Sequence, residues 1–260
     1  MTAPTAARRF HGGRRPLDAP DDLLRWYAAG SDGDVFNPGD GGSVFSDLAG
    51  TVPANAGEPA GRIVGARGQH HLAAPQDTKR PTYDLDASGR PHLVTASGDL
   101  MVSDATLVIK GPMFIVAAVS RSAAAGLPLF RLIKDSGNYA GINNVSSGQR
   151  AANVARYASG AVASVLPNID PWPLDEIEVI SAQLIDGAMD VRIGDLELSG
   201  LSPFTGGVEA TGAGIGLNAN SLTSGAAQVM RFYGGAVFYA KPTPRERDEI
   251  HQYYRERLGL

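Results

Sequence analysis

The chain has 260 residues, and a hydrophobic fraction of 43% with 19% charged residues supplies enough apolar side chains for a folded core. A net charge of −4 argues against a protein that coats nucleic acid with its whole surface, and the absence of cysteine excludes disulfide scaffolds, zinc ribbons and thiol nucleophiles. The 32 glycines and 17 prolines favour many short strands joined by turns over long helices.

Residues 1–20 form a short basic arm, whose four arginines and single acid give a net charge of +3. Since the whole chain carries −4, the remaining 240 residues carry −7. We expect the arm to anchor the protein to an acidic partner surface, and the arginines concerned are Arg8, Arg9, Arg14 and Arg15. A poorly ordered tail without a partner is the alternative interpretation.

The arm lacks an apolar stretch behind its arginines, so it does not resemble a secretory signal peptide. No segment approaches the ~20 apolar residues that a membrane-spanning helix needs. We therefore expect a protein that is made in the cytoplasm and does not enter a membrane.

Residues 21–92 are predicted to be a loop-rich part that packs on the main body. A short helix is expected from Asp21 to Gly30, because acids occupy its first turn and a glycine would end it. Between Ser31 and Pro81, Gly, Pro, Asp and Asn are frequent, which indicates irregular loops with short strands.

Residues 93–260 are predicted to be the main body, because apolar runs alternate there with turn signals. Asp186-Gly187 is the strongest short hairpin signal in the chain. The expected strands cover 114–119, 127–133, 176–185, 189–193 and 196–198, with two further pieces in 228–239 around Gly234-Gly235. Strands at this spacing predict an all-β fold, an antiparallel two-sheet jelly-roll sandwich formed by residues 21–260 as one domain.

The chain ends in a predicted helix. Thr243-Pro244-Arg245-Glu246 is a capping box with proline at the first helical position. Four apolar residues follow at helical spacing, and Gly259 is placed to close the helix; the four are Ile250, Tyr253, Tyr254 and Leu258. We expect this helix to pack on the sheet edge and to fix the end of the chain.

Two groups of sequence segments resemble known proteins. The first resembles a recurrent opening of phage structural proteins and comprises 34–40, 44–53, 57–62, 68–73 and 79–83. The second is similar to the ending of concanavalin A-like, or laminin-G-like, jelly rolls and comprises 232–239, 243–247 and 253–259. The resemblance covers roughly residues 30–260, while the middle of the chain matches as a strand pattern.

This resemblance implies an antiparallel jelly roll in a virion, where such domains serve as capsid decorations, head fibres, tail components or carbohydrate-binding modules. The chain departs from the pattern at two places. Asn37-Pro38-Gly39-Asp40 stands where Asp-Pro-Ser-Asp is usual, and 64–68 lacks the acid that usually precedes Ser-Gly. If that acid binds calcium in relatives, this chain lacks the ligand.

Sugar binding on a jelly roll requires an aromatic platform beside amide or carboxylate groups. Tyr139 with Asp135, Asn143 and Asn144 on one loop system would provide such a site. Trp172, between two prolines, is a second candidate platform, and a loop plug against the sheet is its alternative role.

Glycoside hydrolases of this fold resemble one another in a strand with Glu-x-Asp-x-x-Glu, whose acids share a face. Glu176 and Glu178 are the nearest match here, although the third acid is absent. A solvated strand face is the stronger interpretation of this pair. No Gly-x-Ser-x-Gly elbow, His-Glu-x-x-His motif or Gly-Lys-[Ser/Thr] phosphate loop occurs.

Metal binding has weak support in the sequence. His70 and His71 are adjacent and would point apart in an extended chain, with no third ligand nearby. No cofactor is expected, and calcium stays open because loop oxygens are plentiful; these belong to Asp32, Asp34, Asp40, Asp135, Asn138, Asn143 and Asn144.

The sequence therefore predicts a non-enzymatic structural component of a phage or phage-like particle, located in the virion and displaying its jelly roll outward. Its expected partners are other virion proteins, reached through the arm, and copies of itself in a symmetric homo-oligomer. A module that binds host surface glycan is the alternative, and a glycoside hydrolase is a weaker one.

Overall fold

The structure is a computed structural model that describes residues 32–104, 106–109, 112–122, 128–135, 138–144, 152–158, 161–165, 174–185, 188–201, 210–227 and 229–260. The basic arm, the expected helix from Asp21 to Gly30, the turn at Asp186-Gly187 and Trp172 lie outside these residues.

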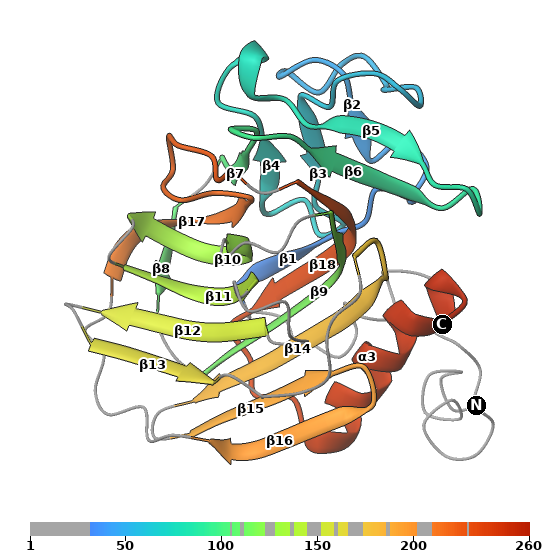
Figure 1. Ribbon diagram of the computed structural model, residues 1–260. Coiled ribbons are helices and arrows are strands. Elements are labelled where there is room, and N and C mark those ends of the chain that lie inside the picture. Colours follow the sequence, from blue (N-terminus) through green and yellow to red (C-terminus); the bar gives the residue numbers. More distant parts are fainter. Residues whose placement is uncertain are drawn as a thin grey trace, which may run out of the picture.

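Two antiparallel sheets face each other, as the sequence predicts (Figure 1). The first has eight strands, and β1 (Gly33–Phe36) pairs with its β18. The other seven lie in the order β16 (Leu196–Leu201), β15 (Ala188–Ile193), β14 (Glu178–Ile185), β9 (Met113–Arg121), β18 (Met230–Phe238), β6 (Pro91–Thr95) and β5 (Thr82–Leu85).

The second sheet has ten strands, and β8 (Leu107–Ile109) pairs with its β17. The other nine lie in the order β13 (Ala161–Val165), β12 (Ala152–Ala158), β11 (Asn138–Asn144), β10 (Pro128–Asp135), β17 (Ala210–Leu217), β7 (Met101–Ser103), β4 (His71–Ala73), β3 (Arg62–Val64) and β2 (Val44–Phe45). The fold is thus a jelly-roll sandwich of two antiparallel sheets.

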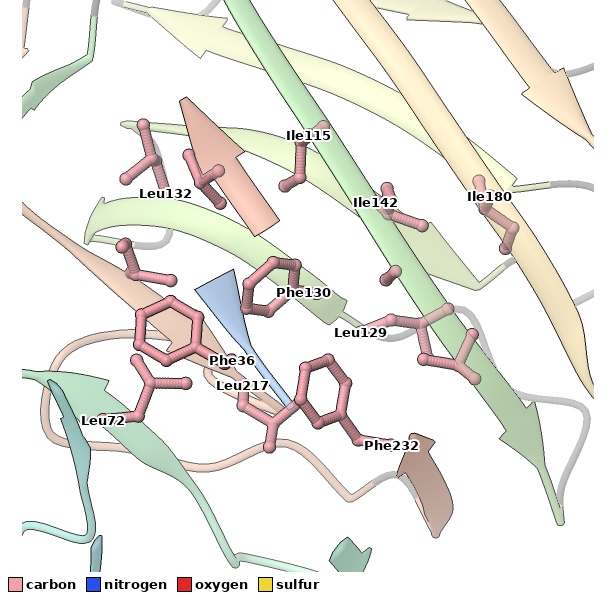
Figure 2. Packing of buried hydrophobic residues seen from close by; sticks show 14 of the residues in the cluster. Phe36, Leu72, Ile115, Leu129, Phe130, Leu132, Ile142, Ile180, Leu217 and Phe232 are labelled. Carbon is pink, nitrogen blue, oxygen red and sulfur yellow. The ribbon is translucent and has the colours of Figure 1, made fainter. Parts of the chain in front are cut away.

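The core lies between the two sheets, because alternate side chains of each strand point inward. Figure 2 shows aromatic rings from both layers meeting there. The ring of Phe130 on β10 lies 5.3 Å from Phe232 and 6.3 Å from Phe36, centre to centre, and all three are buried. These edge and tilted contacts join the sheets beyond what buried area alone contributes.

A second apolar layer covers the outside of the eight-stranded sheet. The outward residues of β9 and β18, such as Val116 and Ala236, are buried under helix α3 (Pro244–Leu258). The helix residues that cover them are the predicted stripe, Ile250, Tyr253, Tyr254 and Leu258. Figure 1 shows α3 lying along this outer face, so the expectation that the helix packs on the sheet edge is wrong.

The local signals of the helix are confirmed. Thr243 Oγ1 accepts from the backbone N–H of Glu246, and the Glu246 carboxylate accepts from the backbone N–H of Thr243. Gly259 ends the helix in the left-handed conformation, at φ +67°.

The prediction of two pieces in 228–239 is wrong, because Met230–Phe238 is a single strand. Its register against β9 shifts between Phe232 and Gly234, which marks a β-bulge. Gly234 adopts φ +155°, and a Cβ there would lie 2.5 Å from Asn37 Oδ1. The glycine pair therefore bends one strand instead of separating two.

The loop-rich part contributes strands to both sheets. β1 and β5 extend the eight-stranded sheet, while β2, β3 and β4 extend the ten-stranded one. A 3₁₀ turn, η1 (Asp77–Lys79), lies between β4 and β5. Within the described ranges, none of the helices has the length and apolarity that crossing a bilayer requires.

Candidate functional site: a polar cleft on the outer sheet face

A cleft of about 520 Å³ opens on the outer face of the eight-stranded sheet, and we call it the outer cleft. Strand alternation builds it, because Leu93 and Phe232 point into the core and leave His92, Val94 and Arg231 on the other side. Its lining residues are Asp84, Leu85, Asp86, Ala87, Arg90, His92, Val94, Asp175, Ile177, Arg231 and Tyr233.

Three segments supply these groups. The hairpin of β5 and β6 places Asp84 opposite His92. β18 is the neighbour of β6 and places Arg231 opposite Val94. The segment before β14 brings Asp175, whose backbone N–H donates to the carbonyl of Arg121 at 2.8 Å.

Asp175 is held in an unusual backbone conformation at the edge of the outer cleft. Its φ is +62°, which is uncommon for a residue other than glycine. Its Oδ1 accepts from Arg231 at 2.5 Å and from Ser122 Oγ at 3.0 Å, and these bonds lower its pKa. Because both donors use Oδ1, no described residue donates to Oδ2.

A second ion pair lies at the hairpin turn. Arg90 Nε donates to Asp86 Oδ2 at 2.6 Å, and Arg90 Nη1 donates to the carbonyl of Leu258 at 2.8 Å. Burial raises the pKa of Asp86, but hydrogen bonds from Arg90 and Ser88 outweigh it, so the net pKa is lowered. Arg90 therefore ties one wall of the outer cleft to the end of α3.

The floor contains an aromatic pair. The rings of His92 and Tyr233 lie 5.0 Å apart, centre to centre, and the Arg90 guanidinium lies 5.9 Å from the Tyr233 ring. Burial lowers the pKa of His92, so this ring is neutral at pH 7. Burial likewise raises the pKa of Tyr233.

Asp84 differs from the other two carboxylates because no arginine pairs with it among the described residues. Its Oδ1 accepts from the backbone N–H of Leu85 at 2.8 Å, while no described group donates to Oδ2. Leu85 is 46% exposed and offers apolar surface at the same rim.

The sequence-predicted glycan residues lie on the opposite sheet. Tyr139, Asn143 and Asn144 belong to strand β11, and Asp135 ends β10, so the expected loop system is a strand pair. Tyr139 and Asn143 meet at Arg131, whose guanidinium lies 4.1 Å from the Tyr139 ring centre and donates to Asn143 Oδ1 at 3.3 Å.

Arg131 has a structural role in this cluster. It is buried, and its Nη2 donates to the carbonyls of Ala219 and Asn220 at 2.8 and 3.2 Å. Burial lowers its pKa to about 10, so it stays charged at pH 7. The guanidinium thus covers one face of the Tyr139 ring and uses the side-chain oxygen of Asn143. Less ring surface and hydrogen-bonding capacity is left for a sugar.

The two acids considered for a hydrolase differ in environment, and the solvated strand face expected for them is wrong for Glu178. Glu176 is exposed and precedes β14, whereas Glu178 is buried at the start of that strand. Neither residue lines the outer cleft.

The acids considered for calcium have protein partners. Asp34 is buried and accepts from four backbone N–H groups at 2.7–3.0 Å, those of Val35, Arg67, Gln69 and His70. Asp32 contacts His70 Nε2 at 2.8 Å, and Asp40 accepts from Arg257 at 2.7 Å. Across the part of the chain that the structure describes, no group of three potential metal-ligating residues comes together.

No protein-family model matches the chain, and no curated protein matches its sequence. Solved structures of similar fold include an arabinofuranosidase complexed with arabinofuranosyl-α-1,2-xylobiose, at 12% identity and a TM-score of 0.51 over 76% of this chain and 51% of that chain. Another is a botulinum neurotoxin serotype D binding domain, at 11% identity and 0.52 over 73% and 48%.

The chain spans about half the length of these two proteins. At this identity the similarity is one of fold, and it agrees with the jelly-roll prediction. The comparisons give no support to a specific relationship with phage proteins.

Proposed function

We propose that this chain is a non-enzymatic carbohydrate-binding module that holds its ligand in the outer cleft. The observation that carries the proposal is the set of polar groups fixed on a rigid sheet and left partly unsatisfied. Asp84 and Asp175 each keep an oxygen without a donor among the described residues, and Arg231 keeps N–H groups beyond its bond to Asp175. Sugar hydroxyls both donate and accept, so they match such a mixture.

The outer cleft also offers apolar surface for a sugar ring. Leu85 and Val94 provide it and lie among these polar groups. Sugar rings have C–H faces that pack on apolar surface while their hydroxyls bind at the edge. One protein of the same fold, the arabinofuranosidase, was solved in complex with an oligosaccharide. That structure supports sugars as the first ligand class to test.

Binding without cleavage is favoured by the charge state of the outer cleft. Glycoside hydrolysis needs a carboxylic acid whose pKa is raised so that it holds a proton near neutral pH. Two of the three carboxyl groups of the outer cleft, those of Asp86 and Asp175, have lowered pKa values and are carboxylates there. A virion location, attachment through residues 1–20 and a homo-oligomer stay predictions from the sequence.

The test is a glycan array followed by calorimetry on wild type, Arg231→Ala, Tyr139→Ala and Trp172→Ala. We expect Arg231→Ala to weaken binding at least about tenfold, because it removes the donor and releases Asp175 from its fixed position. Tyr139→Ala is expected to bind like wild type. Loss of binding in Tyr139→Ala or Trp172→Ala, with Arg231→Ala unaffected, would move the site to the residues predicted from sequence.

A further inference from the structure

The charges of the outer cleft do not balance. Two arginines face three aspartates, and His92 is neutral, so the lining carries one net negative charge at pH 7. The two ion pairs, Arg231 with Asp175 and Arg90 with Asp86, account for both cations. Asp84 is left over.

Each arginine is already committed to its own carboxylate, at 2.5 Å for Asp175 and 2.6 Å for Asp86. An acidic sugar could still accept from the remaining N–H groups of Arg231, but the charge of each arginine is already balanced by its own aspartate. The sugar carboxylate would therefore add a second uncompensated negative charge beside Asp84. This costs binding energy, because like charges in a half-enclosed site are screened less than in open water.

We infer that Asp84 makes the outer cleft selective for uncharged and amino-bearing glycans and against acidic ones. The inference rests on the proposed function and names its ligand class. A hydroxyl or an ammonium group can donate to the open Oδ2 of Asp84, whereas a carboxylate has no proton to offer. Charge-assisted bonds of this kind are the stronger ones, so an ammonium group gains most.

The position of Asp84 supports a role in selectivity. It lies on β5 opposite His92, on the side of the sheet that forms the outer cleft, and it is half-buried. Its Oδ1 accepts from the Leu85 amide, which fixes the direction of Oδ2. Ligand binding therefore loses little further conformational entropy of this side chain. Leu85 next to it is exposed and adds apolar contact.

The experiment uses an array of neutral, glucosamine-containing and uronic- or sialic-acid-containing glycans, followed by titration of the strongest member of each class. Wild type is expected to bind the first two classes and to bind acidic glycans at least about tenfold more weakly. Asp84→Asn keeps the Oδ1 acceptor for Leu85 and removes the charge, so it should lower affinity for amino glycans and raise affinity for acidic ones.

Asp77→Asn is the matched control, because Asp77 lies on η1 outside the outer cleft and its loss changes the net charge equally. It should leave the ratio between classes unchanged. A wild type that prefers acidic glycans, or an Asp84→Asn ratio identical to wild type, overturns the inference while the proposed function stands. An array with no ligand at all overturns the proposed function, and the inference with it.

Discussion

His251 shows how burial decides the chemistry of one residue. It lies on α3 against β14, is completely buried, and its Nδ1 is 3.4 Å from Ser181 Oγ. Burial lowers its pKa to about 3, and the nearby guanidinium groups of Arg192 and Arg255 add to this effect. A Ser–His pair so enclosed can order the helix, but no substrate can reach it.

The free energy of unfolding is therefore expected to depend on pH through His251. The unfolded state binds this proton near pH 6.5, whereas the folded state binds it near pH 3. The contribution of neutral His251 to the free energy of unfolding is fully present above about pH 6.5. On acidification it is lost by up to about 1.4 kcal/mol per pH unit. Urea unfolding of His251→Leu at pH 7.5, 6.0 and 5.0 should show a flatter pH dependence than wild type.

His71→Gln is a suitable control for this measurement, because His71 is partly exposed on β4. It should retain the wild-type slope. A slope in His251→Leu equal to that of wild type would show that another group causes the acid sensitivity.

At the same scale, the sequence could suggest that Tyr139 and Asn143 lie together, but not what lies between them. The decisive residue is Arg131, which pairs in register with Gly141. A Cβ at Gly141 would come within 2.2 Å of Arg131 Cβ, so the glycine makes room for the base of the Arg131 side chain. Arginine is rarely buried, and no local pattern around Arg131 signals that it is.

Among the elements, β18 depends strongly on one backbone position. Gly234 has a positive φ, and an added Cβ would meet Asn37 Oδ1 at 2.5 Å and Tyr254 of α3 at 3.1 Å. Gly234→Ala should therefore lower the free energy of unfolding by roughly 2 kcal/mol or more, through strain at the bulge and a poorer fit of α3.

Gly41→Ala supplies the comparison, since a Cβ there meets nothing within 4 Å and the backbone is not in the left-handed region. Its effect should stay within about 0.5 kcal/mol in the same denaturation experiment. Equal effects of the two substitutions would contradict the role given to Gly234.

The elements differ in how well their sequences predict them, for a physical reason. The C-terminal helix was predictable because its cap, its stripe and its closing glycine act within a few residues of one another. β18 was predicted as two pieces because a glycine pair usually interrupts a strand, and the bulge that keeps it whole depends on pairing with β9. Asn143 and Asn144 are expected on a loop, whereas both lie on β11, because residue propensity ignores the partner strands.

On the scale of the whole molecule, the outer cleft joins three segments that are distant in sequence. Asp84, Asp175 and Arg231 come from β5, the segment before β14, and β18. Their meeting follows from strand order, which the sequence did not reveal, so the sequence could predict the fold class but not this site. None of the three has a distinctive motif around it.

Because one ligand would contact all three segments, binding should stabilise the entire domain. A bound ligand at 100 times its Kd adds about 2.7 kcal/mol to the free energy of unfolding. For a chain of this size that corresponds to a rise in Tm of several degrees. Differential scanning fluorimetry with the strongest array ligand should show this shift in wild type and much less of it in Arg231→Ala.

The place of β18 in its sheet also governs how the protein is made. It lies between β9 and β6 and joins the two parts of the sheet, which are β16, β15, β14 and β9 on one side and β6 and β5 on the other. β18 is also the last of these strands in the sequence, so it leaves the ribosome after all the others. Until residues 230–238 emerge, β9 and β6 present unpaired edges, which invite association with other nascent chains. Folding of this sandwich therefore finishes after translation has passed β18, and we expect its yield in cells to rise with slower synthesis or added chaperone.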